Sequence, residues 1–85
     1  MSNPEINQAT GTKSWYNYKN QRHRLGGPAV EFKSGRKAWF INGKFIYRLL
    51  SDGRTVKAKG VDFNTIPKVM KQSIAIEVLK LKADE

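Results

Sequence analysis

Residues 30–57 read VEFKSGRKAWFINGKFIYRLLSDGRTVK, with three glycine-containing turns between short runs of β-forming side chains. The turns centre on Ser34-Gly35, Asn42-Gly43 and Asp52-Gly53. Asn-Gly and Asp-Gly favour tight hairpins, because a type I′ turn requires positive φ at both central residues. This part of the chain therefore predicts an antiparallel β-meander.

On either side of this segment the pattern changes. Residues 1–12 are small and polar and predict a flexible N-terminus, whereas the turn signal Gly26-Gly27-Pro28 extends the meander over residues 13–63. From residue 64 the apolar spacing becomes helical, with Thr65 as a possible cap and Pro67 suited to a first turn. The helical stripe contains Ile66, Val69, Met70, Ile74, Val78 and Leu81.

The predicted fold class is α+β: a small antiparallel meander of four to five strands, with a C-terminal helical segment over residues 64–85 that covers one face. Ile74, Ile76 and Val78 also alternate, so an edge strand over residues 73–81 is the alternative to the helix. We interpret the helical stripe as core; its alternative role is a seam between two copies of the chain, which would make a homo-oligomer.

An internal repeat is visible at an offset of about 24 residues. Trp15-Tyr16 matches Trp39-Phe40, and His23-Arg24-Leu25 matches Tyr47-Arg48-Leu49. A period of this length indicates a repeated supersecondary unit.

The turns also predict which side chains share a face. Two-residue loops at Asn42-Gly43 and Asp52-Gly53 place Arg48 opposite both Lys37 and Lys57, and a three-residue loop ends at a left-handed Gly35. One face is then apolar: Val30, Phe32, Ala38, Phe40, Phe45, Tyr47, Leu49 and Val56. The other carries a row of Glu31, Lys37, Arg48 and Lys57, beside Trp39, Ile46 and Lys59. Directly opposed like charges cost up to about 1 kcal/mol, which marks this basic face as functional.

Charge indicates the partner. The net charge is +9, and the first sixty residues carry all of it, with twelve lysines and arginines against three carboxylates. A polyanion is therefore expected to bind. There is no cysteine and one histidine, so we expect no disulfide, metal or cofactor. No apolar run approaches a membrane span and the N-terminus is no signal peptide, which predicts a cytoplasmic protein without membrane attachment.

The predicted site is a nucleic-acid-binding surface with no catalytic residue. Lysine and arginine neutralise phosphates, while Trp39 either stacks on a base or packs in the core. His23 either hydrogen-bonds a turn or assists phosphodiester cleavage; no second acid–base group accompanies it, so we expect no enzyme. The candidate binding residues are Lys37, Arg48, Lys57, Trp39, Lys59, Lys44, Arg22, His23, Arg24 and Lys19.

Two segments, Arg22–Ala29 (RHRLGGPA) and Gly35–Lys44 (GRKAWFINGK), resemble MORN-like repeat variants, which carry a His-Arg, Gly-Pro-Ala, Gly, Trp, Asn-Gly pattern. The resemblance covers about residues 15–49 and implies β-hairpins. The second unit departs from the pattern, because Tyr47-Arg48 replaces His-Arg and Leu50–Gly53 replaces Gly-Pro-Ala.

By size, basicity and this motif, the whole chain also resembles small phage inhibitors of type III toxin–antitoxin endoribonucleases. That resemblance implies a non-enzymatic antitoxin-like inhibitor that binds RNA and engages a host toxin ribonuclease in an RNA-containing complex, in host defence evasion. It transfers no toxin-contacting residue. The alternative is an inhibitor that docks its basic face on an acidic protein surface without nucleic acid.

Overall fold

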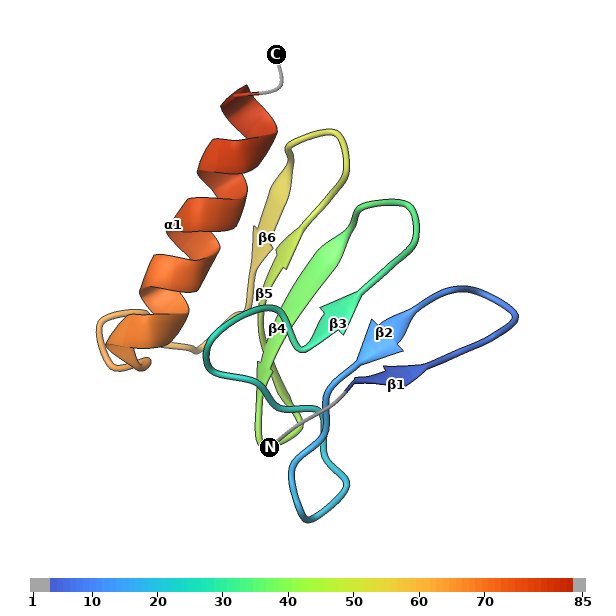
Figure 1. Cartoon of the computed structure of the whole chain (residues 1–85). Helices are drawn as coiled ribbons and strands as arrows, with labels where there is room; N and C mark the ends of the chain where they lie inside the picture. The colour runs from blue at the N-terminus through green and yellow to red at the C-terminus, as the bar shows by residue number, and fades with distance from the viewer. Residues whose placement is uncertain (1–3, 84–85) are drawn as a thin grey trace.

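The computed structural model describes residues 4–83, which form a six-stranded antiparallel sheet followed by one helix (Figure 1). Each strand pairs with the next along the chain, so the sheet is a meander, and the predicted α+β class is confirmed. The elements are β1 (Glu5–Ile6), β2 (Lys13–Ser14), β3 (Val30–Glu31), β4 (Lys37–Ile41), β5 (Lys44–Leu49), β6 (Thr55–Lys57) and α1 (Lys68–Ala83). Strand β1 lies within the segment that we expected to be flexible.

Two of the turns have the same three-residue form. In the first, Gly35 has φ 99°, and the Phe32 N–H donates to the Arg36 carbonyl at 2.9 Å, as the sequence predicts. In the second, Gly53 has φ 94° and the Leu50 N–H donates to the Arg54 carbonyl at 2.8 Å. The loop at Asp52-Gly53 therefore has three residues, and the two-residue prediction is wrong.

The pairing of β4 with β5 contains a β-bulge. The Asn42-Gly43 turn sets Phe40 opposite Phe45 as predicted, but Trp39 then lies opposite Tyr47, which leaves Ile46 as the extra residue. A bulge shifts every later pair by one position. Lys37 consequently faces Leu49 instead of Arg48.

The longer loop shifts β6 in the same way. Arg48 lies opposite Val56, and Lys57 lies opposite Tyr47. The predicted row of Glu31, Lys37, Arg48 and Lys57 is therefore wrong beyond its first pair, because Arg48 is on the other face from Lys37 and Lys57.

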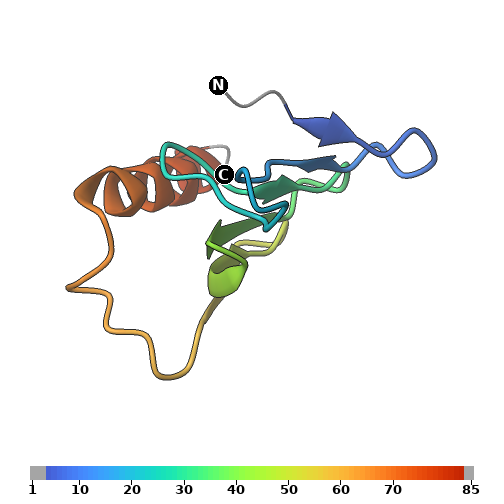
Figure 2. The same ribbon diagram turned by 90° about the horizontal axis from the view of Figure 1, so that it is seen from below.

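Helix α1 covers the sheet face that carries Trp39 (Figure 2). Trp39 is fully buried, and its indole Nε1–H donates to the Ser73 hydroxyl at 3.0 Å. The buried core is Trp39, Ile46, Tyr47, Leu49, Ile66 and Met70. Of the predicted apolar layer, Tyr47 and Leu49 do lie under the helix, whereas Val30, Phe32, Ala38, Phe40, Phe45 and Val56 share the opposite face.

The C-terminal segment is a helix, so the edge-strand alternative is wrong. The Pro67 carbonyl accepts from the N–H groups of Met70 and Lys71, at 3.0 and 3.2 Å. Thr65 does not cap the helix, because the helix begins only at Lys68 and the Thr65 hydroxyl donates to the Asp62 carbonyl at 2.7 Å. Val69 is 45% exposed and so lies outside the core, unlike the rest of the predicted stripe. Over residues 4–83, no helix has the length and apolarity that crossing a membrane requires.

The sequence repeat corresponds to a structural repeat of tryptophans. The Trp15 carbonyl accepts a hydrogen bond from the His23 N–H at 3.0 Å, so these two residues lie side by side on neighbouring segments. In the second unit the corresponding residues, Trp39 and Tyr47, lie opposite each other on β4 and β5. Both indoles are buried. The guanidinium of Arg24 lies 4.0 Å from the centroid of Trp15. In the first unit Arg24 therefore covers the indole, whereas in the second unit α1 covers it.

Candidate nucleic-acid interface

The sheet face that α1 leaves uncovered carries arginines and aromatic rings. Cross-strand partners share a face and alternate residues along a strand return to it, so the row of Val30, Ala38, Arg48 and Val56 defines this face. We call it the arginine–aromatic face. Its arginines and rings are Arg22, Arg36, Arg48, Arg54, Tyr16, Phe32, Phe40 and Phe45.

The rings hold the guanidinium groups in place. Phe40 and Phe45 meet edge to face, with centroids 5.8 Å apart, and the Arg48 guanidinium lies 5.3 Å from the Phe45 centroid. Arg22 lies 5.9 Å from Phe40 in the same way. The rings are half-buried and the arginines are exposed. Stacking on a ring leaves the N–H donors of a guanidinium free to bind phosphate.

A second group of cations lies at the hairpin ends of this face. Arg36 and Arg54 line one cavity of about 360 Å³, with Leu50 between them. The Arg36 guanidinium also lies 5.2 Å from the Phe32 ring. Neighbouring strands are about 4.8 Å apart, so arginines two strands apart are separated by about 10 Å. This spread of charge suits an extended polyanion better than one small anion.

Two carboxylates share the arginine–aromatic face in the described part of the chain, Glu5 and Asp52. Asp52 Oδ2 lies 2.6 Å from Arg54 Nε, and its Oδ1 accepts from the Arg54 backbone N–H at 3.0 Å. The backbone hydrogen bond lowers the pKa of Asp52 most, and the Arg54 side chain lowers it further. Asp52 therefore stays ionised at neutral pH and partly neutralises Arg54.

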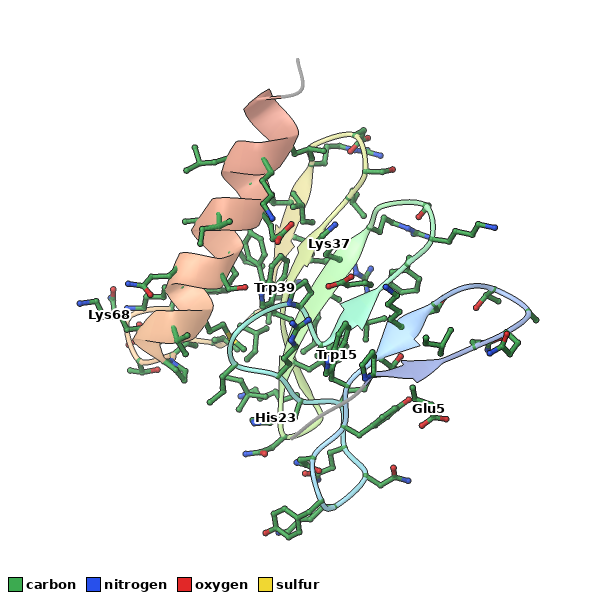
Figure 3. The ribbon with its side chains drawn as sticks, viewed as in Figure 1. Glu5, Trp15, His23, Lys37, Trp39 and Lys68 are labelled. Carbon is green, nitrogen blue, oxygen red and sulfur yellow. The ribbon has the colours of Figure 1, made fainter. Side chains whose placement is uncertain are left out.

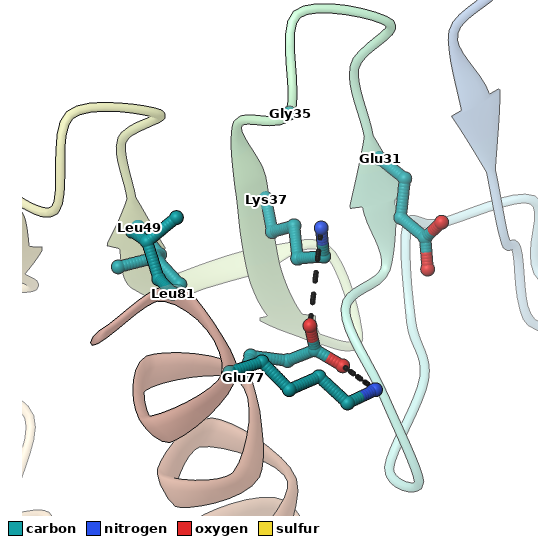
Figure 4. A pocket seen from close by; sticks show the side chains of 7 residues that line it. Glu31, Gly35, Lys37, Leu49, Glu77 and Leu81 are labelled. Atoms are coloured by element: carbon teal, nitrogen blue, oxygen red, sulfur yellow. Dashed lines mark ion pairs between the residues drawn. The ribbon is translucent and has the colours of Figure 1, made fainter. Parts of the chain in front are cut away.

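Lys37 and Trp39, which we expected on the binding surface, lie under the helix (Figure 3). Lys37 Nζ is 3.8 Å from Glu77 Oε1 on α1, and Lys80 Nζ is 3.6 Å from Glu77 Oε2 (Figure 4). Because Trp39 is fully buried, the core interpretation of this residue is correct and base stacking by it is excluded in this fold.

Three other predicted lysines do not join the arginine–aromatic face. Lys57 pairs with Tyr47 on the helix side, and its Nζ lies 5.6 Å from the Phe63 ring. Lys44 lies opposite Ile41 and lines a cavity beneath the helix start. Lys59 is exposed in the turn after β6.

The basic residues before Gly26 lie in different environments. Arg24 is half-buried between Trp15 and Glu31, with a 3.4 Å ion pair to the latter. His23 Nδ1 accepts from the Asn42 N–H at 2.9 Å, which is the turn hydrogen bond that its structural interpretation predicts. Lys19 is exposed in a separate loop.

Arg22 and Arg48 are thus the predicted site residues that the fold brings onto one face. Sequence reasoning missed Arg36, Arg54 and the aromatic rings beneath the arginines. A signal for both arginines was present, because each directly follows the left-handed glycine of a three-residue loop. That signal alone does not place the two arginines on one face, because the bulge at Ile46 also shifts β5 by one residue relative to β4.

The fold and this surface define a six-stranded meander with one helix and an arginine-rich open face. Comparison of the chain with protein-family models, curated proteins and solved structures found no match. Within residues 4–83, no three His, Asp or Glu side chains are grouped as metal ligands.

Proposed function

We propose that this protein binds single-stranded RNA through the arginine–aromatic face and acts as a non-enzymatic inhibitor of a ribonuclease. The observation that carries the proposal is the set of exposed guanidinium groups over half-buried rings, on the sheet face that α1 leaves open.

The chemistry of this face fits an unpaired strand. Arginines release counterions when they contact phosphates, and guanidinium planes and aromatic rings stack on splayed bases. Reading a duplex through its major groove needs a protruding element such as a helix. Here α1 packs on the opposite side of the sheet, and residues 61–85 have as many carboxylates as lysines.

The inhibitory part of the proposal rests on the resemblance to small phage inhibitors of toxin endoribonucleases. A chain of this kind would block its target by holding RNA that the nuclease also binds, within one RNA-containing complex. Docking on an acidic protein surface without RNA is the competing function, and the experiment below distinguishes the two.

The test compares two variants with equal loss of charge. Binding of a fluorescent, unstructured twelve-nucleotide RNA is measured by anisotropy between 50 and 200 mM salt. If four phosphates are contacted, the log–log slope is about −2.8 and affinity falls about fiftyfold over this range. The open-face variant Arg36→Gln, Arg48→Gln, Arg54→Gln should retain a slope of about −0.7, which is a fall of about threefold.

The matched control is Lys13→Gln, Lys44→Gln, Lys57→Gln, which removes three exposed lysines from the helix side of the sheet. It should keep most of the affinity and the slope. Equal weakening by both variants would show attraction by net charge without a site. An absence of RNA binding by the parent protein would favour docking on an acidic protein. Circular dichroism melts confirm that each variant is folded.

A further inference from the structure

The arginine–aromatic face ends at a cavity of about 340 Å³ beside the β1–β2 hairpin. Arg22, Tyr16 and Phe32 line this cavity and also belong to the face, so the two are continuous. The volume is at the lower end of the range for small-molecule pockets, which suits a single nucleobase with part of its sugar.

The cavity wall has hydrogen-bonding groups left free. Ser14 is buried, and residues 4–83 provide no hydrogen bond to its hydroxyl. Ser14 thus adds a hydroxyl group to the polar lining of the cavity.

Glu5 is the unexpected member of this wall. It pairs with Ser14 across β1 and β2, at the sheet edge remote from α1 (Figure 3). No cation within residues 4–83 forms an ion pair with Glu5, although Arg22 lines the same cavity. An unpaired carboxylate on a phosphate-binding face weakens non-specific binding by repulsion. Such a carboxylate strengthens RNA binding only where it accepts hydrogen bonds from a base.

The four bases differ in what they offer a carboxylate. Guanine presents two adjacent donors, N1–H and N2–H₂, which match the two oxygens of a carboxylate. Cytosine and adenine offer one exocyclic amino group beside an acceptor, and uracil offers one N–H between two acceptors. An acceptor next to the carboxylate is repelled, so guanine fits this wall best.

We propose that this cavity is a guanine-binding subsite of the arginine–aromatic face. Glu5 accepts from N1–H and N2–H₂ of one unpaired guanine, the ring of Phe32 or Tyr16 stacks on the base, and Arg22 binds the adjoining phosphate. The inference rests on the proposed function, because it assigns a base preference to the same RNA-binding surface.

The test uses the full chain and three twelve-nucleotide RNAs: oligouridylate, the same strand with one central guanine, and the same strand with inosine at that position. A good bidentate contact to a base discriminates by about 1–3 kcal/mol, so the guanine strand should bind at least about fivefold more tightly than oligouridylate. Inosine lacks the N2 amino group and should bind with intermediate affinity.

The informative variant is Glu5→Gln, at an exposed position of a two-residue strand. It should reduce the preference for guanine to less than twofold while oligouridylate binds equally well or better. Asp52→Asn removes the other carboxylate of the face and should keep the preference. Guanine preference retained in Glu5→Gln, or a parent protein that binds the guanine strand no more tightly than oligouridylate, overturns the subsite alone. A failure of the parent to bind any of the RNAs overturns the proposed function together with the subsite.

Discussion

Replacing Trp39 with phenylalanine tests whether this residue belongs to the core or to the RNA-binding surface that we propose. The indole is fully buried between β4 and α1, meets Tyr47 edge to face at 5.7 Å, and donates to Ser73 at 3.0 Å. The guanidinium groups that we assign to RNA lie on the other side of the sheet. Trp39→Phe should therefore lower stability and leave RNA affinity unchanged.

The expected loss has two parts. Removing the hydrogen bond to Ser73 costs about 1 kcal/mol, and the smaller ring gives up about another 1 kcal/mol of packing. For a domain of this size each kcal/mol lowers the melting temperature by about 4–8 °C, so a decrease of about 8–16 °C is expected. Ser73→Ala removes the same hydrogen bond from the other side. The double variant should therefore show a coupling of about 1 kcal/mol.

The measurement combines thermal melts by circular dichroism with RNA anisotropy at a temperature where every variant is folded. Affinity within twofold of the parent, with the lower melting temperature, supports the core position of Trp39. A tenfold loss of RNA affinity with a nearly unchanged melting temperature would refute the reasoning, because it would place the indole in contact with RNA.

Two further substitutions test individual contacts. Gly27→Ala should lower the melting temperature by several degrees, because an added Cβ would lie 2.7 Å from Arg24 Cζ and displace the guanidinium from the indole of Trp15. Gly26→Ala is the control, because a Cβ added there would have no atom within 4 Å. Equal melting temperatures of the two variants would contradict this prediction. Asp52→Asn should tighten RNA binding by up to about fivefold at 0.1 M salt, because it removes the carboxylate that competes with phosphate for Arg54. Anisotropy measures this change, and an unaltered affinity would exclude Arg54 from the contact.

Most features that sequence reasoning predicted correctly have a signal within one short segment of the chain. Asn42 and Gly43 have φ of 49° and 84°, as a type I′ turn requires. Gly35 also has positive φ, which glycine adopts without the steric cost that other residues incur. The helical spacing after Pro67 likewise predicted α1. Each of these signals is local and does not depend on what packs against the segment.

The bulge at Ile46 has no such local signal. It allows Ile46 and Tyr47 both to be buried under α1, so the gain comes from tertiary packing that the turn sequence does not reveal. Because side chains alternate with a period of two, this one residue moved Arg48 to the face opposite Lys37. The positive net charge therefore follows directly from the sequence, whereas the set of residues on the arginine–aromatic face does not.

Strand β5 places Arg48 between Tyr47 and Leu49, both of which are buried against the helix side. Neighbouring residues of β5 therefore differ in position: Arg48 is exposed on the arginine–aromatic face, whereas Tyr47 and Leu49 belong to the core. Substitutions at Arg48 should therefore change the proposed RNA binding without repacking the interior. An insertion or deletion of one residue between residues 44 and 49 would move buried side chains of β5 to the open face and exposed ones to the helix side. We therefore expect laboratory selection to accept replacements on the open face far more readily than changes in the length of β5.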